Sequence, residues 1–289
     1  IDLKFELKSD SAFRQNVKKA FGTRPKEFKD EVNSFFAEGV RLIRRAKGPD
    51  TKIVFIFDQL EQMRGALGLE EDVIRSVERI FSIEIDLLRL QYIHVIYTVP
   101  PWLSFLGARQ VSVETLPAVH LWRNDPERSP DEFAWAAYRR LVRRRLEDAG
   151  LQRLFGAAPE AANESIDRLI EMSGGQIRDM LRLLREVVLR SDALPSLPVP
   201  SSLVTRAINA VRSDFLPIAQ EDAKWLDVIA RNRVTALLST DAGPVMRLAR
   251  FLDTHSVLFF KNGDEWYDVH PLIRDEIAKV IKVAVGQPT

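Results

Sequence analysis

The chain has 289 residues, with 42 Lys and Arg against 41 Asp and Glu, no Cys, and a hydrophobic fraction of 46%. This length suits two domains, the apolar fraction argues against wholesale disorder, and a net charge of +1 gives no general attraction to nucleic acid or anionic membranes. The lack of Cys excludes disulfides and thiolate metal sites, and no apolar run reaches the ~20 residues that span a bilayer, so we expect a cytoplasmic protein without a membrane partner.

The first part of the chain alternates between helical and strand patterns. Two unbroken apolar runs are typical of strands buried on both faces of a parallel sheet. Long helical patterns precede and separate them, which is the alternation expected of crossover connections. In order, the pattern predicts a helix over 13–47, a strand over 53–57, a helix over 70–91, a strand over 92–97 and a shorter third strand over 118–122.

The rest of the chain reads as helices that end in a hairpin. A segment rich in Pro and Ser at 194–202 indicates a linker. An Asn-Gly turn signal lies between two short apolar strands, which is typical of a β-hairpin. The predicted helices are 131–149, 163–172, 176–190, 203–211, 221–232 and, after Gly243-Pro244, 245–253; the predicted hairpin strands are 257–260 and 266–269. Helices followed by a hairpin within this length are typical of a winged-helix module.

The first predicted strand ends in Asp58, which places a carboxylate at the carboxyl edge of the sheet, where α/β folds bind ligands. The segment resembles a Walker B element, in which such an Asp holds Mg²⁺. The second strand is followed by Thr98, where a polar residue resembles the sensor 1 position of AAA+ and STAND ATPases. An acidic residue after a core strand and a strand-ending Thr are also common in any sheet.

A double glycine, Gly174-Gly175, opens a helix with Arg178 near its start. The segment resembles the sensor 2 region of a helical lid, where an Arg faces the nucleotide phosphates. The simpler interpretation is a helix–helix turn.

Taken together, these motifs resemble the STAND/AAA+ superfamily of P-loop ATPases, especially bacterial regulatory or defence ATPases and origin-recognition ATPases. The resemblance implies an α/β fold with a partial parallel-sheet ATPase core over 1–128, a helical lid over 129–195 and a winged-helix domain over 201–289. It implies ATP or ADP and Mg²⁺ as ligands of the intact protein, with Mg²⁺ held by Asp58.

The resemblance also assigns roles to individual side chains. It implies that Thr98 senses the γ-phosphate or the attacking water, and that Arg178 reports the phosphates to the lid. Arg123, just after the third predicted strand, is a candidate arginine finger that reaches a neighbouring subunit. The simpler interpretation of Arg123 is a cation at a strand end with no partner.

Two departures from the family pattern affect the expected activity. None of the 13 glycines is followed by Lys, so the phosphate-binding loop G-x-x-x-x-G-K-[ST] is absent from the chain. We expect this loop upstream of Ile1, while the competing hypothesis is a degenerate, non-hydrolysing scaffold. In addition, Gln59 occupies the position after Asp58 where many relatives carry a catalytic acid, so hydrolysis requires Glu61 or is slow.

The expected function is therefore a nucleotide-dependent regulatory switch in bacterial signalling or anti-phage defence, with self-association or a partner protein. The alternative is a DNA-binding initiator or transcription regulator. Residues 197–289 carry 11 basic and 11 acidic residues, which disfavours DNA binding by the winged helix. A basic run on the helix over 131–149 is interpreted either as a solvated face or as a contact with nucleotide, nucleic acid or a neighbouring subunit; its members are Arg139, Arg140, Arg143, Arg144 and Arg145.

Overall fold

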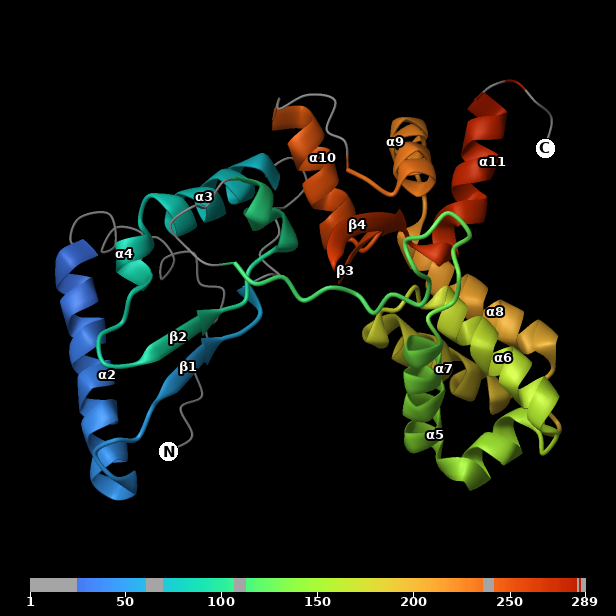
Figure 1. Ribbon diagram of the computed structural model, residues 1–289, viewed down its shortest axis with the longest axis horizontal. Coiled ribbons are helices and arrows are strands. Elements are labelled where there is room, and N and C mark those ends of the chain that lie inside the picture. Colours follow the sequence, from blue (N-terminus) through green and yellow to red (C-terminus); the bar gives the residue numbers. More distant parts are fainter. Residues whose placement is uncertain (1–24, 61–69, 107–112, 236–241, 285, 287–289) are drawn as a thin grey trace. The chain divides into compact units, whose positions relative to one another are not determined.

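The computed structural model describes residues 25–60, 70–106, 113–235, 242–284 and 286. The chain is a mixed α/β protein, mostly helical, with two small sheets (Figure 1). It divides into two compact units, unit 1 over Ile1–Val113 and unit 2 over Glu114–Thr289. Among the described helices, none is long and apolar enough to cross a membrane.

Unit 1 contains a parallel pair of strands with helices before and between them. Its elements are α2 (Pro25–Lys47), β1 (Val54–Phe57), α3 (Glu70–Ser82), α4 (Ile85–Leu88), β2 (His94–Tyr97) and the short 3-10 helix η2 (Pro101–Leu106). The two predicted strands and their parallel pairing are confirmed, with Phe57 opposite Tyr97 at the end of the ladder. The helix predicted over 70–91 is interrupted between α3 and α4, where Arg79 forms an ion pair with Glu84 at 2.8 Å.

The two faces of this sheet differ in how well they are covered. On one face, Phe36 of α2 packs edge-on against Phe55, and Phe81 of α3 packs against Tyr97. On the other face, Val54 and Ile56 are 53% and 59% exposed. The expectation that the first strand is buried on both faces is therefore wrong for the described residues, because a two-stranded sheet with helices on one side leaves its second face open.

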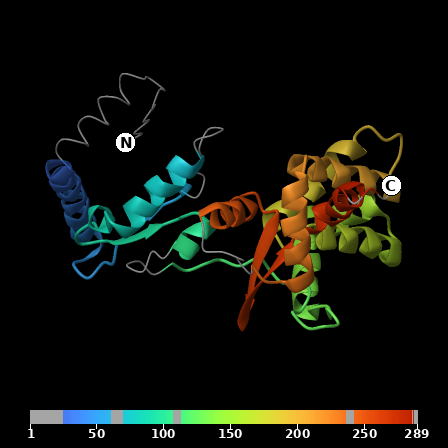
Figure 2. The ribbon, with the colours of Figure 1, turned by 90° about the horizontal axis from the view of Figure 1, so that it is seen from above.

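Unit 2 begins with an extended segment followed by helices, and it ends with a hairpin and a further helix. Its elements are α5 (Glu132–Phe155), α6 (Pro159–Met172), α7 (Ile177–Ser191), α8 (Ser201–Arg212), η3 (Ser213–Phe215), α9 (Gln220–Asn232), α10 (Ala242–Asp253), β3 (Val257–Asn262), β4 (Asp264–Val269), η4 (Pro271–Ile273) and α11 (Arg274–Ala284). The predicted hairpin is confirmed as an antiparallel pair, and Gly263 at its tip has a left-handed φ of 104°. In Figure 2 the hairpin, coloured red-orange, extends beyond the helices around it.

The segment over 118–122 is not a third strand of the unit 1 sheet, which corrects the prediction. It lies in unit 2, where the Ala118 N–H donates to the carbonyl of Phe259 in β3 and the Val119 N–H donates to the carbonyl of Gly175. Only Trp122 forms a bridge, with Pro130. This mostly apolar segment is extended, and its hydrogen-bond partners lie in the hairpin and in the turn before α7.

The Pro-rich segment over 194–202 is an ordered connection inside unit 2. The Val199 N–H donates to the carbonyl of Leu154 at the end of α5, and Val199 is buried. Because α7 and α8 pack against each other on either side of it, the segment separates no compact bodies, although its composition is that of a linker. The compact division lies earlier, between Val113 and Glu114.

Candidate functional site

The carboxyl edge of the β1–β2 pair brings Asp58 and Thr98 side by side. The strand register ends with Phe57 opposite Tyr97, so the next residue on each strand is Asp58 and Thr98. The Thr98 N–H donates to the Phe57 carbonyl at 3.0 Å, and the Thr98 hydroxyl reaches the same oxygen at 3.4 Å. The carboxylate and the hydroxyl thus share one edge of the sheet, and the Asp58 side chain is exposed there.

Gln59 has an unusual backbone conformation directly after Asp58. Its φ is 70°, in the left-handed region that residues with a side chain rarely adopt. The Gln59 N–H donates to Asp58 Oδ1 at 2.9 Å, which fixes the orientation of the carboxylate. Strained residues of this kind are often found at ligand-binding turns. The neighbouring candidate acid, Glu61, lies outside the described residues.

The donor set at this edge fits Mg²⁺ that arrives with a nucleotide. Within the described ranges, no three His, Asp or Glu side chains converge into a metal site. Magnesium usually takes one or two carboxylates and completes its octahedron with water and phosphate oxygens. An exposed Asp58 with an adjacent hydroxyl can supply the protein part of such a shell but cannot form a metal site alone.

The two candidate arginines belong to unit 2 and are both exposed. Arg178 is the second residue of α7, and Arg123 follows the bridge residue Trp122. The backbone N–H of Arg123 donates to the Ser129 carbonyl in a tight loop. The structure brings Asp58 and Thr98 together in unit 1 and leaves Arg178 and Arg123 as separate surface cations of unit 2.

The double glycine before α7 has a steric explanation that the sequence does not reveal. Gly175 has a φ of 81°, and a Cβ on this residue would lie 1.7 Å from the carbonyl oxygen of Val119. Gly174 has a φ of 60°, and its Cβ would lie 2.6 Å from a methyl group of Leu258. The turn needs glycine because the extended segment and the hairpin pack directly onto it.

A buried polar cluster lies beside Arg178 that the sequence pattern does not predict. Asp179 is 1% exposed; its Oδ1 accepts from Arg182 at 3.0 Å, and its Oδ2 lies 3.4 Å from Nε2 of His270. Nδ1 of His270 accepts from the Leu272 N–H at 3.2 Å, so the ring proton resides on Nε2 and faces the carboxylate. Burial alone would raise the pKa of Asp179, but His270 and Arg182 outweigh it and lower this pKa below its usual value. No sequence spacing connects Asp179 with a histidine 91 positions later.

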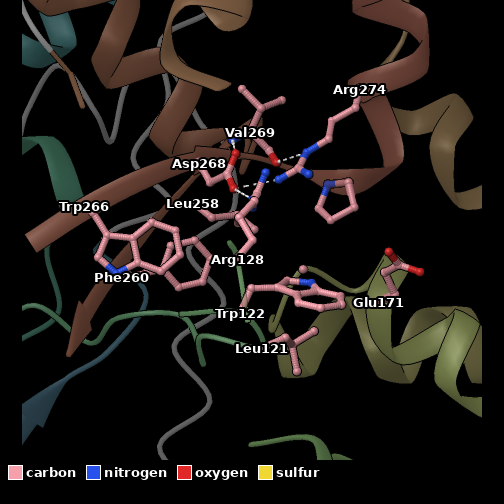
Figure 3. Close-up of a pocket in the computed structure, with 12 residues that line it drawn as sticks. Leu121, Trp122, Arg128, Glu171, Leu258, Phe260, Trp266, Asp268, Val269 and Arg274 are labelled. Atoms are coloured by element: carbon pink, nitrogen blue, oxygen red, sulfur yellow. Dashed lines mark hydrogen bonds and ion pairs between the residues drawn. The ribbon is translucent and has the colours of Figure 1, made fainter. Parts of the chain in front are cut away.

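A second buried carboxylate joins the hairpin to the loop before α5 (Figure 3). Asp268 of β4 accepts hydrogen bonds from Arg128 and, at 2.7 Å, from Arg274 at the start of α11. Burial lowers the pKa of Arg274, and the nearby Asp268 opposes that shift. The pocket beside them encloses about 40 Å³, with Trp122 and Glu171 among its lining residues. This volume holds a few water molecules, and Asp268, Arg128 and Arg274 are already paired with one another, so their contacts hold the hairpin in place.

The arginines of α10, the helix that would read DNA in a winged helix, are neutralised within the unit. Arg247 forms an ion pair with Glu221 at 3.1 Å, and Arg250 binds Asp222 at 2.6 Å. Both acids lie in the first turn of α9. This pairing reduces the charge that α10 presents to phosphates.

Comparisons with protein-family models, curated proteins and solved structures gave no match to this chain.

Proposed function

We propose that this chain is part of a nucleotide-dependent ATPase switch of the STAND/AAA+ kind, with the nucleotide at the carboxyl edge of β1 and β2. The observation that carries the proposal is the register of the parallel pair, which sets Asp58 beside Thr98. Ligands of parallel α/β sheets bind at this edge. The left-handed Gln59 immediately after Asp58 gives independent support.

In this proposal Asp58 would hold Mg²⁺ that arrives with the nucleotide. The metal would neutralise phosphate charge, and the Thr98 hydroxyl would contact the γ-phosphate or a water next to it. Gln59 can orient a water through its amide but cannot accept its proton, so we expect slow turnover and a switch governed by nucleotide state. Arg178 and Arg123 remain the proposed cations that reach the phosphates from the lid and from a neighbouring subunit.

The proposal requires a phosphate-binding loop that the 289 residues do not contain. Gly-Lys occurs nowhere in the sequence. The open sheet face over Val54 and Ile56 leaves room for further elements, since parallel sheets are normally covered on both faces. Additional strands and helices would both complete the sheet and bring the loop next to Asp58.

Unit 2 is the proposed output module, with α8–α10 and the β3–β4 hairpin in a winged-helix-like order. The Arg128–Asp268–Arg274 and Asp179–His270 contacts tie the hairpin to the segments around α5 and α7. We therefore propose that unit 2 responds to nucleotide as one body, rather than bending at 195–200. Bacterial regulation or anti-phage defence in the cytoplasm is the proposed setting.

The experiment is a measurement of Mg²⁺-dependent ATP binding and hydrolysis by the protein expressed from its whole reading frame. Replacing Asp58 with Asn removes the metal-binding charge and keeps the shape, so we expect at least a tenfold loss of Mg²⁺-dependent nucleotide affinity or turnover. Asp50→Asn is the matched control, because Asp50 is an exposed acid in the turn at the opposite end of the same strand.

Equal nucleotide binding by the Asp58→Asn protein and the parent would show that Asp58 is not the metal ligand. A whole reading frame that lacks G-x-x-x-x-G-K-[ST] and binds no nucleotide would leave the scaffold as the surviving alternative.

A further inference from the structure

The outer face of α5 carries three arginines and an exposed aromatic ring. Ala134, Trp135, Tyr138 and Val142 form the buried face of this helix. At 100° per residue, Phe133, Arg140, Arg143 and Arg144 fall within one arc on the opposite side. All four are exposed, and Phe133 retains 80% of its surface. We call these four residues the α5 outer face; α5 is labelled in Figure 1.

These three arginines differ from most others in unit 2 because their charges are not neutralised. Arg139, the next residue on the helix, makes a bidentate ion pair with Asp167, with both hydrogen bonds at 2.7 Å. Paired arginines elsewhere in the unit include Arg128, Arg182, Arg190, Arg212, Arg231, Arg247, Arg250 and Arg274. In the part of the chain that the structure describes, the side chains of Arg140, Arg143 and Arg144 have no hydrogen bond or ion pair.

The spacing of these residues produces repulsion that an anionic partner would relieve. Arg140 stands three and four residues before Arg143 and Arg144, and like charges at these separations destabilise a helix. The acidic residues nearest in sequence to the α5 outer face lie at its two ends, with Glu132 before it and Glu147 and Asp148 after it. Glu147 has a φ of 57° and marks a kink in α5, so the regular helix that carries the α5 outer face ends before Glu147.

We infer that the α5 outer face docks a single strand of nucleic acid. Guanidinium groups bind phosphate oxygens in a bidentate manner, and an exposed ring two turns earlier offers a stacking surface for a base. From Phe133 to Arg144 the helix rises about 16 Å, which is enough to follow a few nucleotides. A single strand matches both parts of this face, because its phosphates can pair with the arginines while a base stacks on Phe133.

In this inference nucleic acid binds to α5 and not to α10, the helix that corresponds to the recognition helix of a winged helix. Both α10 arginines are held by acids of α9, while the α5 arginines are free to exchange counterions for phosphates. The surface is independent of the Asp58 edge in unit 1, so the inference does not rest on the proposed ATPase function.

The test is fluorescence anisotropy of the 289-residue chain with a labelled oligo-dT of about 20 nucleotides, titrated at salt concentrations from about 50 to 200 mM. We expect the triple variant R140Q/R143Q/R144Q to bind at least about tenfold more weakly at the lowest salt. The slope of log affinity against log salt should fall by about 2, at ~0.7 for each lost single-strand phosphate contact. Phe133→Ala should weaken binding several-fold and leave the salt slope unchanged.

Arg206→Gln is the matched control, since Arg206 is an exposed arginine of α8 without an ion pair or hydrogen bond among the described residues. Gln is a good helix former, so the triple variant should keep the circular dichroism spectrum of the parent. Absence of binding at the lowest salt, or equal binding by the parent and the triple variant, would overturn the inference. So would loss of self-association in the triple variant in light scattering without oligonucleotide binding by the parent, because the face would then contact a second copy.

Discussion

Neighbouring residues at the start of α7 have opposite environments. Arg178 is exposed, whereas Asp179 is buried and faced by Arg182, His270 and His255. Nδ1 of His255 lies 4.0 Å from the Asp179 carboxylate, and His255 has a left-handed φ of 57°. Burial lowers the pKa of His255, with Arg178 and His270 adding to this effect and Asp179 and Asp253 opposing it. The folded state therefore favours the neutral ring.

This environment predicts that acid weakens unit 2. The unfolded chain protonates His255 near pH 6.5 and the folded chain only at lower pH, so its contribution to stability is complete above about pH 6.5 and is lost as the pH falls below that value. We expect His255→Asn, which tolerates a left-handed φ, to flatten the fall in Tm between about pH 7.5 and 5. The ring is 37% exposed, which limits the difference to under about 1 kcal/mol, or about 4 °C. Parallel Tm–pH profiles for the variant and the parent would contradict this.

At the scale of elements, the contact between the Gly174-Gly175 turn and the extended segment determines how unit 2 is built. The Val119 N–H donates to the Gly175 carbonyl, and the carbonyl oxygen of Val119 occupies the space of a Gly175 side chain. Ala118 joins the same segment to β3 and lies in an apolar cluster with Leu258, Phe260 and Trp266. The turn, the segment and the hairpin therefore form one packed region.

Two glycine substitutions in unit 2 should have opposite effects. Gly175→Ala places a Cβ 1.7 Å from a backbone oxygen at a left-handed φ, and we expect it to destabilise the unit by about 3 kcal/mol or more. Gly150→Ala lies inside α5, its Cβ would meet only Leu146 at 3.9 Å, and it should stabilise by about 0.5–1 kcal/mol. Urea unfolding of both variants measures the difference. A Gly175→Ala protein as stable as the parent would refute the close packing of this turn.

On the scale of the whole molecule, the two units differ in how completely they bury apolar surface. Unit 2 has a continuous series of buried side chains from α5 to α11, with Leu169, Leu183 and Ile273 fully buried. Unit 1 leaves Phe35, Val54 and Ile56 at least half exposed. Unit 2 thus has its own core, while one face of the unit 1 sheet is open among the described residues.

This contrast predicts how the two parts behave when they are separated. Residues 114–289 alone should fold and unfold in one cooperative transition, because this unit contains its own hydrophobic core. The fragment over 1–113 should bind a hydrophobic dye and associate, because its open sheet face is apolar. Circular dichroism melts and dye fluorescence of the two fragments check both expectations. An unfolded 114–289 fragment would show that the proposed output module depends on unit 1.

The sequence by itself determined where most of the helices and strands form, because this depends on local periodicity. The apolar run before Asp58, the run before Thr98 and the Asn-Gly hairpin each became the predicted element. The helix α11 was not predicted, although its apolar residues Ile277 and Val280 are spaced as on one helical face with Ile273.

Only the tertiary structure decided which partners those elements take. The strand-like run at 118–122 forms hydrogen bonds with β3 and with the turn before α7 and joins no sheet, and the linker-like run at 194–202 packs inside unit 2. The balanced charge of the sequence likewise does not show that the arginines of α10 are in ion pairs while three arginines of α5 are not. Ion pairs, steric contacts and burial depend on residues far apart in the chain, and local pattern carries no record of them.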